Sequence, residues 1–248
     1  MTPTLVSRRE QIDLISEAID AYGDGITILE AGCGRAWPLK LSIDYTLVGL
    51  DLDEEALRLR VRQQKDLDDY RVGDLRDAHF PPGSFDVIYC AYVLEHVEGV
   101  EKVLDNFARW IRPGGLIVLR IPDKDSVYAL LARSTPHWFH VLFCKHVNGY
   151  RDAGKPGHAP YPVVYEDAMS RRGIEAFCAA HGFSPSVTAA AAYKRSWFRP
   201  LAFLVSALTL GKYAWRHNNL TYLIAAGSAA AAKAERRSDE PRAQAASA

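Results

Sequence analysis

Apolar runs that stop at a glycine or an acidic residue constrain the fold of this chain most. Residues 26–32 are β-branched and apolar and end at a glycine, and residues 45–51 form a second run that ends at Asp51. Continuous apolar runs of this length are typical of strands buried on both faces of a parallel sheet. The chain between them is too short for more than a crossover, and a helical pattern with acidic residues in its first turn follows Asp51.

The alternation of apolar runs with helical segments continues for two more strands. Residues 84–93 and 115–122 are apolar, and a helical segment and the turn 112–115 separate them. An amphipathic helix that carries Ile12, Ile15 and Ile19 precedes the first strand. This alternation predicts an α/β fold, a doubly wound, Rossmann-like and mostly parallel sheet with helices on both faces. Such a sheet binds ligands beyond the carboxyl ends of its strands.

The periodicity weakens after Pro122. Residues 123–164 are rich in histidine, proline, glycine and aromatic residues, which predicts an acceptor-site insert or a lid. Regular patterns return with a helix at 170–182 and a closing strand at 219–227.

We expect one domain over residues 1–228, with a cofactor-binding half at 8–122 and the insert and roof at 123–215. Residues 229–248 contain no aromatic and no large apolar side chain. A segment of this composition cannot offset its ordering entropy, so we expect a disordered tail.

Charge and cysteine content exclude several classes of protein. The chain has 30 Lys and Arg against 30 Asp and Glu, whereas nucleic-acid binders usually carry a basic excess, so we expect no nucleic-acid partner, although local basic patches remain compatible. The four cysteines are widely spaced, which favours neither a disulfide framework nor a zinc site. Charges at Arg8, Arg9 and Glu10 interrupt any export signal, so the expected location is cytoplasmic.

The most apolar segment is residues 200–211. Its twelve residues fall short of the roughly 18 that span a bilayer. We expect it to pack on the end of the sheet or to roof the acceptor pocket. Aromatic and basic residues flank it, so peripheral membrane contact through 197–215 remains the less favoured alternative.

The first candidate site follows the first strand, at Glu30, Gly32 and Gly34. Glycines let a backbone approach a bound adenosine-containing cofactor, and the N-terminus of a following helix would offer free N–H groups. A dinucleotide fingerprint needs a small residue where this chain has Trp37, which disfavours NAD.

Two aspartates extend the pattern. Asp51 can accept both hydrogen bonds of a ribose diol, and Asp74, after a short apolar segment, can accept from an exocyclic amine. Taken singly, Asp51 could only cap the helix that begins at Asp53, and Asp74 could only stabilise a turn. Together with the glycines they predict a binding site for an adenosine cofactor.

The motifs, in chain order, are LEAGCG, VGLDLD, VGDLRD, FDVIYCAYVLEHV and LDNFARWIRPGGLIVLRIP. In this order and spacing they resemble the class I S-adenosylmethionine (SAM)-dependent methyltransferases of the methyltransferase-type-11 and ubiquinone-biosynthesis group, over residues 8–122. The resemblance implies an enzyme with SAM as cofactor. Its acceptor would be a small-molecule, lipid or sugar-containing metabolite, with methylation of oxygen favoured over nitrogen or carbon.

The resemblance also implies a role for each matched residue. Glu30, Gly32 and Gly34 border the methionine moiety, Asp51 the ribose hydroxyls, Leu52 the adenine face, Asp74 the adenine amine with Leu75 beside it, and Cys90 to Tyr92 the sulfonium side. Arg8 or Arg9 would pair with the cofactor carboxylate.

His96 is the candidate catalytic residue, because it follows the fourth strand near the point where the methyl group would emerge. Some ubiquinone-type relatives carry Glu-x-x-Glu-His here as a metal site, but Tyr92 replaces the first glutamate. We therefore expect no metal. His137 and His140, with aromatic residues between them, are expected to line the substrate site or the core.

Three alternatives remain open from the sequence: a SAM-binding protein without catalysis, a NAD-linked Rossmann oxidoreductase, and a peripheral membrane protein. The oligomeric state and the identity of the acceptor are open as well.

Overall fold

The computed structural model describes residues 3–147, 149–155, 160–161, 163–164, 166–192 and 199–227, without the side chains of 186–188 and 192. The predicted tail, 229–248, lies outside these residues. The strands are β1 (Thr4–Val6), β2 (Ile26–Ala31), β3 (Tyr45–Asp51), β4 (Asp69–Val72), β5 (Phe85–Ala91), β6 (Ile111–Pro122), β7 (Ser184–Ala192) and β8 (His217–Ala225). The helices are α1 (Arg8–Asp20), α2 (Glu54–Gln63), α3 (Val100–Trp110), α4 (Val127–Arg133), α5 (His137–His146), α6 (Arg171–His181) and α7 (Arg199–Leu208), with short 3-10 helices η1 (Leu94–His96) and η2 (Asp167–Met169).

All eight strands form one sheet in the order β1-β7-β8-β6-β5-β2-β3-β4. Only β8 runs antiparallel to its neighbours, β6 and β7. The chain order reverses between β2 and β5, so the loops after these two strands open into a crevice. The predicted α/β fold with a mostly parallel sheet is confirmed.

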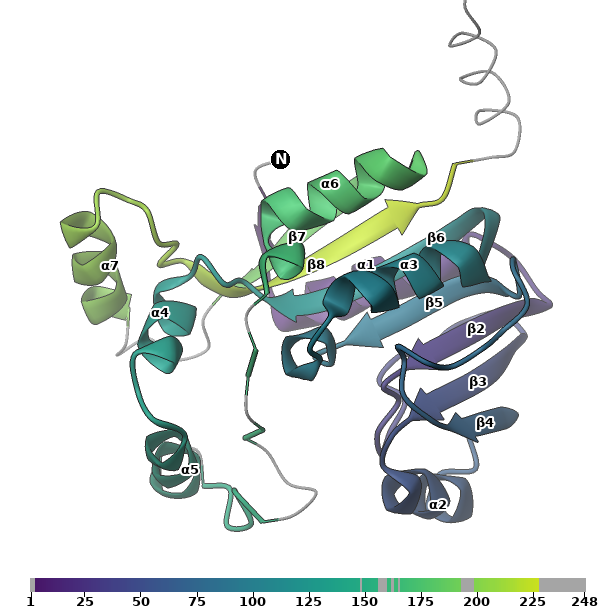
Figure 1. The fold of residues 1–248 in the computed structure, drawn as a ribbon, viewed down its shortest axis with the longest axis horizontal. Helices are drawn as coiled ribbons and strands as arrows, with labels where there is room; N and C mark the ends of the chain where they lie inside the picture. Colours follow the sequence, from purple (N-terminus) through teal and green to yellow (C-terminus); the bar gives the residue numbers. More distant parts are fainter. Residues whose placement is uncertain are drawn as a thin grey trace, which may run out of the picture.

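Helices cover both faces of the sheet (Figure 1). On one face α3 and α6 pack on the sheet, with Phe107 and Trp110 fully buried in the core. On the other face Ile15 and Ile19 of α1 pack against Ile28 and its neighbours. Burying both faces stabilises the strands as continuous apolar runs, which is the pattern seen in the sequence.

The crossover between β2 and β3 contains no helix. Residues 33–44 instead run as a loop whose Leu39 is buried, and whose Trp37 is partly buried, in the same core as α1. Pro38 lacks an N–H and disfavours helix at the residue before it, which accounts for the loop. The prediction that a helix N-terminus follows Gly34 is therefore wrong.

Segment 200–211 forms α7, but its orientation differs from expectation. The helix contacts α4 and buries its small residues Ala202 and Ser206, while Leu204 and Leu208 are exposed. Its large apolar side chains thus do not pack on the sheet end. None of the described helices has the length and hydropathy to cross a membrane.

A buried arginine ties α2 to the end of β2. The side chain of Arg60 has no exposed surface. Its Nε and Nη2 donate to the two carboxylate oxygens of Asp66, at 2.9 and 3.1 Å, and its Nη1 donates to the carbonyl of Cys33 at 2.7 Å. The same Nη1 lies 2.7 Å from Oε2 of Glu30. One guanidinium therefore fixes the loop that follows β2.

Removing this charge should destabilise the protein strongly. Arg60→Met leaves Glu30 buried without its cation, and breaking a buried pair in this way costs about 3 to 5 kcal/mol. Arg58→Met is the matched control, because Arg58 pairs with Glu54 on the exposed side of the same helix and such pairs contribute at most about 1 kcal/mol. Urea unfolding measures both free energies of unfolding, and equal losses would contradict the role of Arg60.

Candidate functional site

Two cavities meet at the carboxyl ends of β2, β3, β5 and β6. The first, about 880 Å³, is lined by Asp51 and is called the Asp51 cavity below. The second, about 490 Å³, is lined by Arg120 and is called the Arg120 cavity. Gly32 and Tyr92 line both. The two cavities therefore adjoin where the order of the strands reverses, the place where such sheets bind ligands.

Asp51 is held in place by backbone N–H groups. Its Oδ2 accepts from Gly34 at 2.7 Å and its Oδ1 from Asp53 at 2.9 Å. Helix α2 is capped by Asp53, whose Oδ1 accepts from Ala56 at 3.0 Å. Asp51 is thus not the cap of this helix, and its partly exposed carboxylate lines the cavity with lone pairs still available.

The loop after β2 requires glycine at position 32. Gly32 has a φ of +72°, and a Cβ built there would lie 2.2 Å from Cγ2 of Val93. An L side chain would therefore be strained by the backbone and would also clash with the residues after β5. Glycine at this position therefore allows Val93 to pack directly against the loop after β2.

Asp74 lies across the Asp51 cavity and is engaged by Arg76. Both carboxylate oxygens accept from the Arg76 guanidinium, with Oδ2 to Nη2 at 2.6 Å, and these bonds lower the pKa of Asp74. Oδ1 also accepts from the backbone N–H of Arg76, so the turn role considered from the sequence is present too. Leu52 is 67% exposed and Leu75 is buried, and both line the same cavity.

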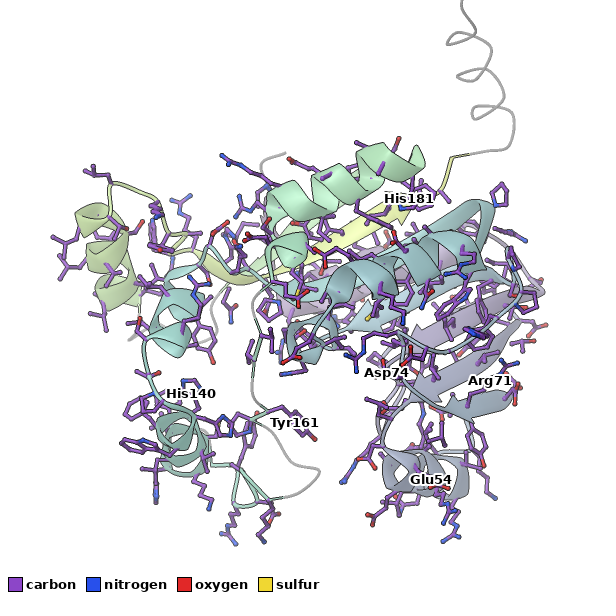
Figure 2. The ribbon with its side chains drawn as sticks, viewed as in Figure 1. Glu54, Arg71, Asp74, His140, Tyr161 and His181 are labelled. Carbon is purple, nitrogen blue, oxygen red and sulfur yellow. The ribbon has the colours of Figure 1, made fainter. Side chains whose placement is uncertain are left out.

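His96 lies on η1 in the wall of the Asp51 cavity, where the insert returns to the sheet. The backbone N–H of Val164 donates to the carbonyl of Glu95 at 2.7 Å, and the Tyr161 ring meets the His96 ring edge-on at 5.6 Å. Figure 2 shows Tyr161 on the segment between α5 and η2. Tyr161 and Asp74 line the same cavity. The insert thus supplies part of this wall, as its composition indicated.

Glu95, beside His96, entered the sequence analysis only as part of the incomplete metal motif. Its carboxyl is buried, which raises its pKa to about 7, and Oε1 lies 4.0 Å from Nε2 of His96. Its other oxygen, Oε2, has no hydrogen-bond partner within the described part of the chain. Glu95 is therefore a carboxyl group that changes charge near neutral pH beside an imidazole ring.

The Arg120 cavity holds a buried cation that was also missed. The Arg120 side chain comes from β6 and donates to the hydroxyls of Tyr89 at 3.2 Å and Tyr92 at 3.4 Å. Among the described residues it forms no ion pair with a carboxylate, and its Nε has no hydrogen-bond partner. A buried charge without a counterion is costly, so this guanidinium is suited to an anionic ligand. Arg8 and Arg9 line the same cavity.

Two residues that we predicted to bind the cofactor, Glu30 and Cys90, have structural contacts next to the site. Glu30 lines the Arg120 cavity, but its carboxyl group also pairs with Arg60, as that of Asp66 does, and burial raises the pKa of Glu30 to about 8.

Cys90 is buried in the core on the face of α3 and lines neither cavity. Successive strand residues point to opposite faces, so Ala91, not Cys90, reaches the cavity, and the assignment of Cys90 to the sulfonium side is corrected.

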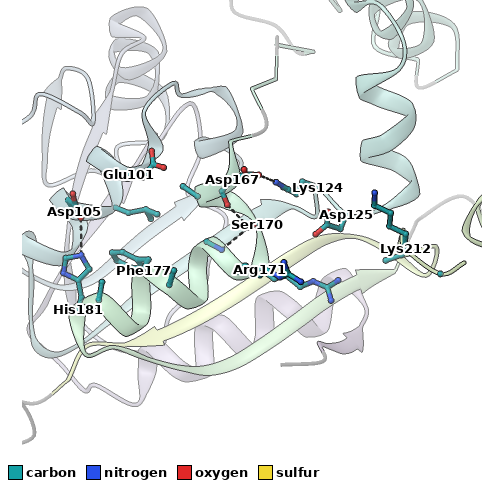
Figure 3. Close-up of a pocket in the computed structure, with 18 residues that line it drawn as sticks. Glu101, Asp105, Lys124, Asp125, Asp167, Ser170, Arg171, Phe177, His181 and Lys212 are labelled. Atoms are coloured by element: carbon teal, nitrogen blue, oxygen red, sulfur yellow. Dashed lines mark hydrogen bonds and ion pairs between the residues drawn. The ribbon is translucent and has the colours of Figure 1, made fainter. Parts of the chain in front are cut away.

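A third and larger hollow, about 1060 Å³, opens between α3, η2 and α6 (Figure 3). Charged residues in it pair with one another, as Lys124 does with Asp167 and His181 with Asp105. No predicted site residue lines it.

The other histidine pair considered, His137 and His140, lies in α5 with ring centroids 6.1 Å apart, and His140 bonds to Thr135. Within the described residues no group of three potential metal ligands occurs.

Comparison with known proteins agrees with this geometry. Residues 29–119 match the family model described as a methyltransferase domain. The chain is 30% identical over 138 residues to a ubiquinone biosynthesis O-methyltransferase of Thiobacillus denitrificans, a match that covers 53% of this chain and 60% of the relative. It is 32% identical over 102 residues to a probable SAM-dependent methyltransferase of Mycolicibacterium smegmatis, covering 40% and 39%. The matches thus span less than two thirds of these relatives.

Solved structures show the same fold. Phosphoethanolamine N-methyltransferase 2 of Haemonchus contortus, solved with S-adenosylhomocysteine, superposes with a TM-score of 0.56 at 15% identity over 88% of this chain and 52% of that one. YcgJ of Bacillus subtilis superposes with a TM-score of 0.53 at 16% identity over 89% and 99%. Residues 29–119 therefore match a methyltransferase domain, and the chain shares its fold with solved SAM-dependent methyltransferases.

Proposed function

We propose that this protein transfers the methyl group of SAM to an oxygen atom of a small-molecule acceptor. The observation that carries the proposal is the junction of the Asp51 cavity and the Arg120 cavity at Gly32. One cavity offers acceptors for a nucleoside and the other offers cations for a carboxylate. A molecule with a nucleoside at one end and an amino acid at the other matches both.

The residues of the Asp51 cavity fit the adenosine part. Asp51 is fixed by two backbone N–H groups, so its carboxylate is preorganised to accept from the ribose hydroxyls. The exposed Leu52 offers an apolar surface to the adenine, and Asp74, kept ionised by Arg76, offers acceptors to its amine. Gly32, which lines both cavities, lies where the chain that joins nucleoside and amino acid would pass.

The Arg120 cavity fits the carboxylate part. Arg120 is placed by two tyrosine hydroxyls and lacks a counterion among the described side chains. Arg8 and Arg9 line the cavity from α1, so the expected contribution of this segment remains part of the proposal. Charge-assisted hydrogen bonds to a carboxylate are stronger than those between neutral groups.

Bound SAM supplies a methyl group already activated on a sulfonium. The protein therefore mainly has to align the acceptor and exclude water. A hydroxyl acceptor also needs its proton removed, and His96 on the cavity wall, with Glu95 beside it, is positioned for this. The names of the relatives, among them O-methyltransferases, support oxygen as the acceptor atom. Tyr161 and Val164 give the acceptor side partly apolar walls.

Loss of the Asp51 carboxylate should weaken the cofactor site. Asp51→Ala is expected to reduce the affinity for S-adenosylhomocysteine at least about tenfold, because hydrogen bonds to charged groups contribute about 1.5 to 3 kcal/mol. Isothermal titration calorimetry measures this. Ser170→Ala is the control: it removes the cap of α6, away from both cavities, and costs about 1 kcal/mol of stability, but should leave the affinity unchanged. Unchanged binding by Asp51→Ala, or tighter binding of NADH than of S-adenosylhomocysteine by the unaltered protein, would overturn the assignment.

The proposed role of Arg120 predicts different effects of its removal on two ligands that share a nucleoside. Arg120→Met should weaken S-adenosylhomocysteine about tenfold or more, because a buried charge pair is lost. It should not affect 5′-methylthioadenosine, which lacks the amino-acid part. Equal effects on the two ligands, or none on either, would show that Arg120 does not bind the cofactor carboxylate.

Glu95 gives a pH dependence of stability. Its folded pKa of about 7 lies above the unfolded value of 4.5, so ionisation in the folded state is penalised. The free energy of unfolding of the wild type should therefore fall as the pH rises from 4.5 through about 7. Glu95→Gln has no carboxyl group to ionise, so its free energy of unfolding should lack this decrease. The stability of the variant relative to wild type should therefore rise by about 3 kcal/mol between about pH 4 and pH 8. Urea unfolding at the two pH values measures the difference, and a constant difference would mean that Glu95 is not held in an apolar site.

A further inference from the structure

Helix α7 exposes its large apolar residues. Ala202 and Ser206 are buried, whereas Leu201, Leu204 and Leu208 are exposed, Leu208 by 75%. Residues spaced by three and four positions lie on one side of a helix, so the three leucines share a face. Surface helices of water-soluble proteins usually turn their apolar side inward. This helix has the reverse arrangement.

Helix α5 has the same character. None of its ten residues is buried, although most are apolar or aromatic. Trp138 is 63% exposed, and Phe139 and Leu142 are exposed as well. Figure 1 shows α4, α5 and α7 together at one end of the molecule, away from the sheet. Two helices with exposed apolar residues therefore occupy the same end.

One side-chain and two backbone hydrogen bonds hold α7 in this orientation. Ser206 donates to the carbonyl of Tyr213 at 2.8 Å, which fixes the loop after the helix. In that loop Ala214 donates to the carbonyl of Asp125 at 2.8 Å and accepts from the N–H of Val127 at 2.9 Å. The leucines thus point outward on a helix that is anchored at its carboxyl end to the start of α4.

Basic residues predominate in the sequence around these helices. The chain as a whole has equal numbers of basic and acidic residues, but no Asp or Glu occurs at 126–151 or at 176–234. Lys145 lies in the last turn of α5. Arg199 is the first residue of α7, and Arg216 lies in the loop after it. Both guanidinium groups lie over the ring of Trp215, at 5.9 and 5.2 Å from its centroid.

We propose that α5 and α7 form a docking surface for an anionic lipid bilayer. Leucine and tryptophan side chains beside arginine and lysine, on helices that carry no acidic residue themselves, match an interface with acyl chains below and anionic headgroups above. At about 1.5 Å per residue the ten residues of α7 are too short to span a bilayer, so the helix lies in its plane. The surface is complementary in charge to lipid phosphates, which is why lipid is the occupant we infer.

Co-sedimentation of the full chain with vesicles tests this inference. The protein should bind vesicles of phosphatidylcholine mixed with phosphatidylglycerol, bind vesicles of phosphatidylcholine alone more weakly, and lose part of its binding in high salt. Leu204→Asp combined with Leu208→Asp should reduce binding at least about tenfold, because each leucine loses its burial in the acyl region. The control combines Leu5→Asp and Tyr70→Asp, which change exposed apolar residues elsewhere on the molecule.

Charge reversal tests the electrostatic part. Arg199→Glu with Arg216→Glu should abolish the preference for phosphatidylglycerol, whereas the matched pair Arg62→Glu with Lys65→Glu on and after α2 should keep it. Near-ultraviolet circular dichroism verifies that each variant is folded. Absence of binding to either vesicle, equal binding by the leucine variant and its control, or self-association in solution that the leucine variant abolishes without any vesicle binding would each overturn the proposal. None of these outcomes depends on methyl transfer, so they are distinct from a failure of the proposed function.

Discussion

One guanidinium, that of Arg60, organises the loop on which the candidate site depends. It comes from α2, reaches the carbonyl of Cys33 and neutralises Asp66 and Glu30 inside the protein. Burial raises the pKa of Glu30 to about 8, and the Arg60 cation opposes this rise, so Arg60 lowers the cost of enclosing an acidic group behind the loop after β2. The next residues in the chain, around Gly34, are in turn held by Asp51. The carboxyl ends of β2 and β3 are thus joined by side chains as well as by the sheet.

This arrangement explains how the loop after β2 is ordered without a helix behind it. A helix N-terminus would supply free N–H groups at this place, but residues 33–44 form none. Instead, the Gly34 N–H is already used by Asp51, and the cations of the site come from side chains, above all Arg120. Binding of the cofactor carboxylate would then depend on Arg120 of β6 and on α1. In this arrangement the carboxylate and the nucleoside of the cofactor would lie on opposite sides of Gly32.

The sequence was informative wherever a local pattern determines structure. Apolar runs and their terminal glycine or aspartate located the strands, and Asp51 and Gly32 lie at the cavities as predicted. It could not indicate the roles of Arg60 and Arg120, because these roles depend on partners distant in the chain, such as Tyr89 for Arg120. Nor could it show that the carboxyl of Glu95 is buried. A lone arginine within an apolar run was the only available signal for Arg120. The orientation of α7 was also undetermined, since periodicity shows that a helix has two faces but not which face is covered.

The central claim is that the Asp51 cavity and the Arg120 cavity are two halves of one cofactor site. A crystal structure of the protein with S-adenosylhomocysteine measures this most directly. We predict the ribose hydroxyls within hydrogen-bond distance of the Asp51 carboxylate and the ligand carboxylate against the Arg120 guanidinium, with the sulfur near Gly32. A ligand bound away from Asp51, or one whose carboxylate lies outside the Arg120 cavity, would contradict it.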